Sequence, residues 1–93
     1  MNNQRTPSIH DSRYRAAIDI LVETRKECNV SQAALAEQVG FTQPDISKIE
    51  RYERRLDFME FIDFLHAITG SDKKLMDRVW KKINECHDRS QKS

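Results

Sequence analysis

The sequence predicts an all-α fold in a single domain. Its 93 residues match the length of one domain core rather than two. Only two glycines and two prolines are present, too few for the hairpins of an all-β fold. Apolar residues recur at helical spacing, and capping residues stand before most of these stretches. Together these observations favour five helices around one core.

The first helix is expected from about Asp11 to Cys28. Residues 1–10 are polar and are expected to form a flexible arm. Asp11 or Ser12 is a suitable N-cap, and Asn29 fits the left-handed position that ends a helix. The apolar residues between them share one face of a helix: Tyr14, Ala17, Ile18, Leu21 and Val22.

A second, shorter helix is expected over residues 32–39. Ser31 is a good N-cap, and most of the residues that follow it are helix formers. Gly40 supplies the positive φ that ends this helix, where a β-carbon would be strained. Phe41 is then expected to pack inward.

The third helix, expected from about Gln43 to Tyr52, has two different faces. Thr42 and Asp45 have nearly the spacing of a capping box at its start. At about 100° per residue, Ile46 and Ile49 fall on one side. The other side is polar and carries amide, hydroxyl and cationic groups, on Gln43, Pro44, Ser47, Lys48 and Arg51.

A fourth helix is predicted by Asp57, by Glu60 three residues later, and by Gly70 at its end. It is the most apolar segment of the chain. Three of its aromatic residues are expected to belong to the core: Phe58, Phe61 and Phe64.

The C-terminal helix is expected over residues 71–87, with Ser71 as its cap and residues 88–93 frayed. Its apolar face consists of Leu75, Met76, Val79, Trp80 and Ile83. This face either closes the core of the monomer or forms the interface of a homodimer, and we favour the second interpretation.

Composition argues against several classes of protein. Sixteen Lys and Arg against fifteen Asp and Glu give a net charge of +1, so bulk charge alone does not indicate a nucleic-acid partner. No run of about 18 apolar residues occurs and the first ten residues lack a hydrophobic signal, so we expect a cytoplasmic protein without a membrane span.

The sequence contains no recognisable catalytic or metal site. Cys28 and Cys86 lack zinc-site spacing, and we interpret them as free thiols, although a disulfide between them remains open. There is no glycine-rich phosphate loop and no plausible pair of nucleophile and base. We therefore expect neither an enzyme nor a cofactor.

The stretch from Leu21 to Gly70 closely resembles the Cro/phage-repressor (XRE-like) helix-turn-helix family. The elements that match are Arg25, Ser31-Gln32, Leu35-Ala36, Gly40, Thr42-Gln43, Ile46-Ser47, Ile49-Glu50-Arg51 and Arg54-Arg55. The resemblance implies a compact five-helix, phage-repressor-like DNA-binding domain over residues 11–70, with the motif at about 31–51. In this family the second helix of the motif enters the major groove of DNA.

The resemblance also implies roles for individual residues. Gln43 is expected to contact a base, as a glutamine can with adenine N6 and N7. Gln32 is expected to bind a phosphate and to support Gln43, while Arg25 and Glu50 form a structural ion pair. The full set implied to contact DNA is Gln32, Thr42, Gln43, Pro44, Ser47, Lys48, Arg51, Arg54 and Arg55.

Four positions depart from the family pattern. Pro44 and Asp45 stand where the family more often has Ser or Thr, which leaves the DNA sequence that is recognised open. Tyr52 replaces the usual glycine after the second helix of the motif, so a less sharply turned exit is expected. Leu56 stands where proline is frequent.

The sequence thus predicts a transcriptional regulator, specifically a repressor, that binds double-stranded DNA as a homodimer. The alternative is an antitoxin-like module that neutralises a protein partner, with DNA binding used for autoregulation.

Overall fold

Five α-helices make up residues 9–91, the part of the chain that the computed structural model describes, and no strand occurs there. They are α1 (Ser12–Glu27), α2 (Gln32–Val39), α3 (Gln43–Glu50), α4 (Phe58–Thr69) and α5 (Lys73–Gln91). The all-α prediction is therefore confirmed. None of these five helices has both the length and the apolar character needed to cross a membrane. Most of the expected N-terminal arm, residues 1–8, lies outside the described residues.

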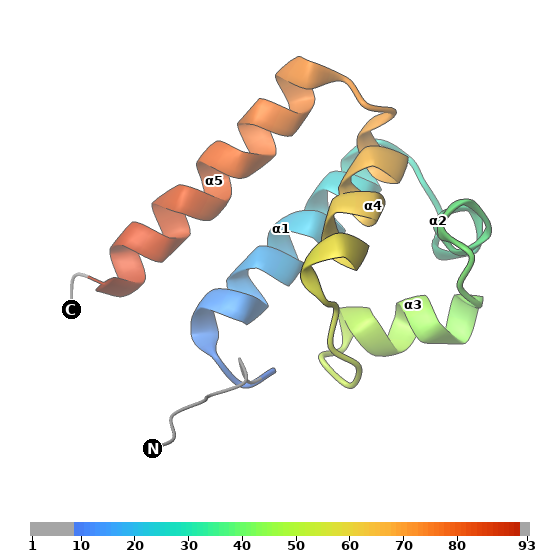
Figure 1. Cartoon of the computed structure of the whole chain (residues 1–93), viewed down its shortest axis with the longest axis horizontal. Coiled ribbons are helices and arrows are strands. Elements are labelled where there is room, and N and C mark those ends of the chain that lie inside the picture. The colour runs from blue at the N-terminus through green and yellow to red at the C-terminus, as the bar shows by residue number, and fades with distance from the viewer. Residues whose placement is uncertain (1–8, 92–93) are drawn as a thin grey trace.

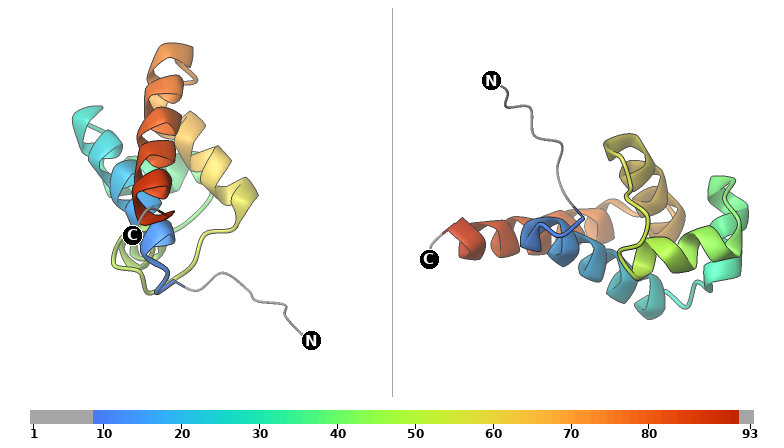
Figure 2. Two further views of the ribbon diagram at one scale, coloured as in Figure 1. Left: turned by 90° about the vertical axis from the view of Figure 1, so that its left-hand side faces the viewer. Right: turned by 90° about the horizontal axis from the view of Figure 1, so that it is seen from below.

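Helix α1 lies in the middle of the molecule. Helix α5 runs along it in the opposite direction, and α4 packs against both (Figure 1). Helices α2 and α3 pack against each other, α2 also against α4 and α3 also against α1. In Figure 1 and in the view from below in Figure 2, α3 and α5 lie at opposite sides of the molecule. Helix α5 therefore leaves α3 uncovered.

The core receives side chains from every helix. Its most deeply buried members are Ile18 of α1, Leu35 of α2, Ile46 and Ile49 of α3, Phe64 and Leu65 of α4, and Val79 of α5. Each such side chain contributes roughly 1.5–3 kcal/mol when it leaves water. Because Ile46 and Ile49 occupy one side of α3, their burial fixes which side of that helix faces outward.

Most helix ends follow the local signals in the sequence. The N-caps are Asp11, Ser31, Thr42 and Asp57, and the last two form complete capping boxes with Asp45 and Glu60. The left-handed positions after the first, second and fourth helices are Asn29 (φ 59°), Gly40 (φ 77°) and Gly70 (φ 65°). These predictions are confirmed.

Three predicted helix boundaries are wrong. Helix α3 ends at Glu50 rather than near Tyr52. Ser71 does not cap α5, because it adopts a positive φ of 63°, and Asp72 instead accepts the N–H of Leu75 at 3.1 Å. Helix α5 continues to Gln91 and so includes the first four residues of the segment 88–93 that was expected to fray. Residues 92 and 93 lie outside the described part.

Phe58 does not belong to the core, which corrects the prediction for the three phenylalanines of α4. It is 71% exposed, whereas Phe61 is half-buried and Phe64 is buried. Each step of three residues falls about 60° short of a full helical turn. Phe58 and Phe64 therefore point about 120° apart, and only one of them can face the core.

Candidate nucleic-acid interface

Helix α3 presents a row of polar side chains to solvent. Ile46 and Ile49 are 0% and 1% exposed on its inner side. On its outer side Gln43, Pro44 and Lys48 are exposed and Ser47 is half-buried. We call these four residues the outer row. The next predicted contact residue along the chain, Arg51, directly follows the helix as its C-cap.

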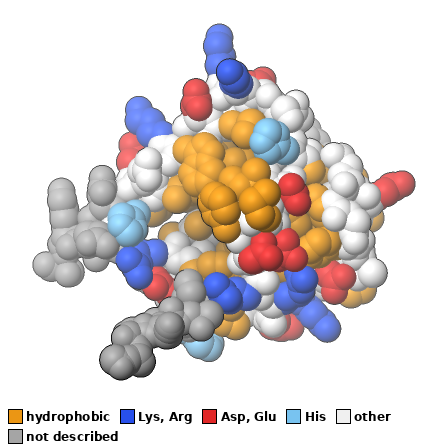
Figure 3. All heavy atoms as spheres, viewed as in Figure 1, with side chains coloured by type: hydrophobic (Ala, Val, Ile, Leu, Met, Phe, Trp, Pro, Cys, Tyr) orange, Lys and Arg blue, Asp and Glu red, His pale blue; other side chains and the backbone are white. Residues whose placement is uncertain are grey.

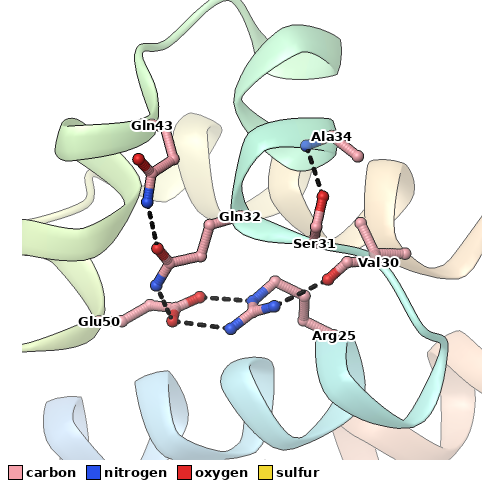
Figure 4. A network of polar contacts seen from close by, with 7 residues as sticks. All are labelled: Arg25, Val30, Ser31, Gln32, Ala34, Gln43 and Glu50. Atoms are coloured by element: carbon pink, nitrogen blue, oxygen red, sulfur yellow. Dashed lines mark hydrogen bonds and ion pairs between the residues drawn. The ribbon is translucent and has the colours of Figure 1, made fainter.

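A line of hydrogen bonds links the start of α3 to the interior of the protein (Figure 4). The Nε2 atom of Gln43 donates to Oε1 of Gln32 at 2.6 Å. The Nε2 atom of Gln32 donates in turn to Oε1 of Glu50 at 2.9 Å. Arg25 completes the line by donating to both carboxylate oxygens of Glu50, at 2.6 and 3.0 Å. The line thus joins α1, α2 and α3.

The negative charge of Glu50 determines which way the side-chain amides of Gln32 and Gln43 are turned. The Glu50 carboxylate can only accept hydrogen bonds, so Gln32 must turn its NH₂ group toward it. The carbonyl oxygen of Gln32 then faces Gln43, which must offer its own NH₂ group. As a result, Oε1 of Gln43 and one N–H of its amide remain available to a ligand, and Oε1 points away from Gln32 in Figure 4.

Arg25 and Glu50 form an ion pair that is nearly removed from solvent. Their side chains are 9% and 13% exposed. Arg25 also donates from Nη1 to the carbonyl oxygen of Val30 at 2.7 Å, which ties in the loop before α2. Because two donors of Arg25 and one of Gln32 surround the Glu50 carboxylate, its negative charge is compensated within the protein.

At the N-terminus of α3, Asp45 acts as a capping residue. Its Oδ2 atom accepts the N–H of Thr42 at 3.1 Å, and its own N–H donates to the Thr42 hydroxyl at 3.3 Å. The hydrogen bond from the Thr42 backbone N–H is the main cause of the lowered pKa of Asp45. Asp45 is therefore charged at neutral pH, but it is directed at the helix terminus rather than outward.

The side chain of Arg51 is engaged with its own neighbours. It donates to the hydroxyl of Ser47 and pairs with the Glu53 carboxylate at 3.2 Å. The hydrogen bond between the two charged groups raises the pKa of Arg51 and lowers that of Glu53. Both side chains are 55% exposed. Exposed ion pairs are weak, so either side chain can readily take another partner. Arg51 thus contacts the outer row through Ser47, and its exposed pair with Glu53 can be exchanged for another partner.

The exit from α3 is sharply turned, so the looser exit expected at Tyr52 is wrong. Tyr52 adopts a φ of 63°, the conformation that the family's usual glycine favours. Its ring lies 4.5 Å below the guanidinium of Arg15, and its hydroxyl donates to Asp19. These contacts with α1 hold the strained residue in place. Sequence reasoning missed them because the partners are more than thirty residues away along the chain.

The two arginines after α3 are placed differently. The guanidinium of Arg54 stacks on the ring of Phe41 at 4.6 Å and lies 3.5 Å from Oε2 of Glu60. Its Nη1 atom is buried and makes no hydrogen bond. Arg55 is exposed and forms no ion pair with any described residue. Arg54 is thus engaged with neighbouring side chains of its own chain, whereas Arg55 forms no such pair among the described residues, and the phosphate contacts expected of both stay predictions.

The two cysteines and the acidic residues do not form a second site in the described part of the chain. Cys28 and Cys86 are free and half-buried. Among the described residues, no three His, Cys, Asp or Glu side chains are grouped so that they could hold a metal ion.

Comparison with known families agrees with this geometry. A helix-turn-helix family model matches residues 21–68, more than half of the chain. The match begins within α1 and ends one residue before the end of α4, so it includes all of α2 and α3. A search of curated proteins finds no match.

Proposed function

Because the chain belongs to the Cro/C1-type (XRE-like) helix-turn-helix family of DNA-binding regulators, we propose that it binds specific sequences of double-stranded DNA and represses transcription. The observation that carries this proposal is the exposed outer row of α3, with Gln43 held at its start by Gln32 and Glu50. In this proposal α3 enters the major groove, which is wide enough to admit a helix.

Sequence discrimination comes from the outer row. Gln43 accepts from adenine N6 through Oε1 and donates to adenine N7 through its remaining N–H, the two-point contact that a glutamine can make. Pro44 offers an apolar surface to a thymine methyl group. Ser47 and Lys48 contact the base edges that follow, and Arg51 exchanges Glu53 for DNA.

Register on the duplex comes from contacts with the phosphate backbone, which carry no sequence information themselves. Gln32 and Thr42 serve this role at the start of the motif, and Arg55 serves it after α3. The contribution of Arg54 is to keep the segment between α3 and α4 in position through Phe41 and Glu60.

The active form in this proposal is a homodimer. A single small motif buries too little DNA surface for high specificity, whereas two copies read half-sites about 34–36 Å apart. Helix α5 takes part in pairing without blocking α3, because it packs on α1 and α4 only. In this proposal the protein regulates a bacterial or phage genome and therefore works in the cytoplasm.

Selection from random DNA duplexes tests the proposal. The wild-type chain should enrich a two-fold symmetric site that contains an A·T pair in each half-site. Gln43→Ala should relax the preference at that pair. Gln38→Ala is the matched control, because Gln38 is an exposed glutamine on α2 outside the outer row. Failure to enrich any sequence, or equal selectivity of wild type and Gln43→Ala, would refute the proposal.

A further inference from the structure

The segment between α3 and α4 is fastened to α1 at two points. At the first, the hydroxyl of Tyr52 donates to Asp19, and the guanidinium of Arg15 lies 4.5 Å from the centre of the Tyr52 ring. At the second, the backbone N–H of Leu56 donates to the hydroxyl of Tyr14 at 2.9 Å. Figures 1 and 2 show the segment beside the start of α1. We call these contacts of Tyr52 and Leu56 with α1 the α1 clamp.

Both fastened positions depart from the family pattern. Tyr52 stands where glycine is usual, and Leu56 stands where proline is frequent. Glycine adopts a positive φ without strain and proline restricts φ through its ring, so both residues shape a turn without contacts from elsewhere. Tyr52 has a φ of 63°, and Leu56 has the N–H that proline lacks. In this chain, contacts with α1 therefore take the place of intrinsic backbone preferences.

Arg15 is itself held in place within the clamp. Its Nε atom donates to the carbonyl oxygen of Ile9 at 2.9 Å, and its Nη2 atom donates to Nδ1 of His10 at 3.0 Å. The flat face of the guanidinium covers the Tyr52 ring, where a cation is attracted by the negative face of the aromatic system. These contacts fix the guanidinium over Tyr52.

Arg55 lies between the two fastened positions. On one side of it, Arg54 stacks on Phe41; on the other, Leu56 is only 4% exposed. Arg55 itself is exposed and forms no ion pair with any other described residue. A cationic side chain is thus attached to a backbone that its neighbours immobilise. Such preorganisation lowers the entropic cost of ordering a side chain against a ligand.

The fastened segment begins where the outer row ends. Arg51 donates to Ser47 of the outer row and directly precedes Tyr52. In Figure 3, Lys and Arg side chains, with acidic ones among them, lie along the lower edge of the molecule, over the start of α1 and the end of α3. The clamp therefore lies beside the outer row, on a surface that carries cationic groups.

We propose that the α1 clamp positions Arg55 to contact a phosphate of the DNA backbone. This inference rests on the proposed function for its ligand, duplex DNA. The clamp residues of α1 act through the fastened segment and do not touch DNA themselves. Loosening the clamp should weaken binding to all sequences alike, because phosphate contacts carry no sequence information. Base preference should stay the same, because Gln32 holds Gln43 at the other end of α3.

Two substitutions at Asp19 test the clamp at constant charge. Asp19→Asn and Asp19→Ala both remove one negative charge from an exposed position of α1, but only asparagine keeps an oxygen that accepts from Tyr52. In fluorescence anisotropy, Asp19→Ala should bind the selected site and random duplexes about two- to tenfold more weakly than Asp19→Asn. This is the range expected when one side chain must be ordered on binding. Equal affinities of the two variants would overturn the proposal.

A double-mutant cycle shows whether the clamp acts through Arg55. Tyr52→Gly removes both contacts with α1 without a change of charge, and glycine accepts the φ of 63° without strain. It should weaken DNA binding in the wild-type chain and have no further effect in Arg55→Ala. A general loss of stability would instead lower the affinity in both backgrounds. Equal losses in the two backgrounds would therefore refute the positioning role.

The same measurements separate this inference from the proposed function. A chain that selects a DNA site, but whose affinity does not change in Asp19→Ala or Tyr52→Gly, would refute the clamp and retain the proposed function. A chain that binds duplex DNA with the predicted coupling between Tyr52 and Arg55, but selects no sequence, would support the clamp and refute the proposed function. Absence of any DNA binding would refute both.

Discussion

Among single residues, Arg25 and Glu50 impose the strongest constraint on the interface. Two nearly buried charges are costly to remove from water, and their mutual hydrogen bonds offset that cost only while both are present. The same pair sets the orientation of Gln32 and, through it, of Gln43. Stability and the presentation of the outer row therefore depend on one ion pair.

Replacing one partner should be worse than replacing both. Arg25→Met leaves the Glu50 carboxylate buried without its main partner and should lower the free energy of unfolding by about 3–5 kcal/mol. Arg25→Met/Glu50→Leu removes both charges and should recover most of that loss. Urea denaturation measures both variants, and a double variant no more stable than the single one would contradict this interpretation.

At position 52, glycine should give a more stable protein than alanine, the reverse of their order in a helix interior. Both substitutions remove the ring contact with Arg15 and the hydrogen bond to Asp19. Alanine retains the strain of a positive φ, whereas glycine relieves it. Tyr52→Gly should therefore be more stable than Tyr52→Ala by about 1 kcal/mol in thermal or urea unfolding. Equal stability of the two variants would mean that this exit is not strained.

For the helices, the sequence predicts beginnings and ends wherever the signal is local. Ser31 and the two capping boxes lie within a few residues of the groups that they cap. The start of α5 was less predictable because Ser71 and Asp72 are both good caps, and only the backbone conformation of Ser71 decides between them. The exit of α3 was not predictable, since contacts with α1 hold Tyr52 in its conformation.

The acidic caps of α1 and α3 should make the fold sensitive to acid. Hydrogen bonds from Arg13 lower the pKa of Asp11 from 3.8 to about 2, and the Thr42 N–H lowers that of Asp45. A carboxyl group whose pKa is lower in the folded state than in the unfolded state stabilises the fold at any pH above its unfolded-state pKa. This stabilisation is lost as the pH falls from the unfolded-state pKa through the folded-state pKa. The melting temperature should therefore fall between about pH 4 and pH 2.

Asp11→Asn/Asp45→Asn should reduce that dependence, because amides do not titrate in this range. Melting curves recorded by circular dichroism between pH 5 and pH 2 measure the effect. An equally steep loss of stability in wild type and in the double variant would show that other groups control the acid transition.

In the segment between α3 and α4, the two arginines should behave differently. Arg55→Ala should weaken binding to all DNA sequences alike and reduce the slope of log affinity against log salt by about 1. Arg54→Ala should leave that slope unchanged and lower stability by roughly 0.5–1 kcal/mol, because it removes the contact with Phe41. Equal salt slopes for the two variants would contradict this assignment.

On the scale of the whole molecule, the outer row of α3 is separate from an apolar groove between α4 and α5, which Phe58, Trp80 and Ile83 help to line. Burial of Ile46 and Ile49 turns the polar side of α3 outward, and this was predictable from spacing alone. Exposure of Phe58 was not, since α4 carries more apolar residues than one face can bury. The resulting arrangement suits a protein that meets DNA on one side and a second copy on another.

The contact between Gln43 and adenine tests the central claim most directly. In the selected site, the adenine assigned to Gln43 is replaced by 7-deazaadenine, which lacks the N7 acceptor and retains base pairing. Wild type should lose about tenfold in affinity, whereas Gln43→Ala should bind both duplexes equally. Equal losses for wild type and Gln43→Ala would show that Gln43 does not read this base from the major groove.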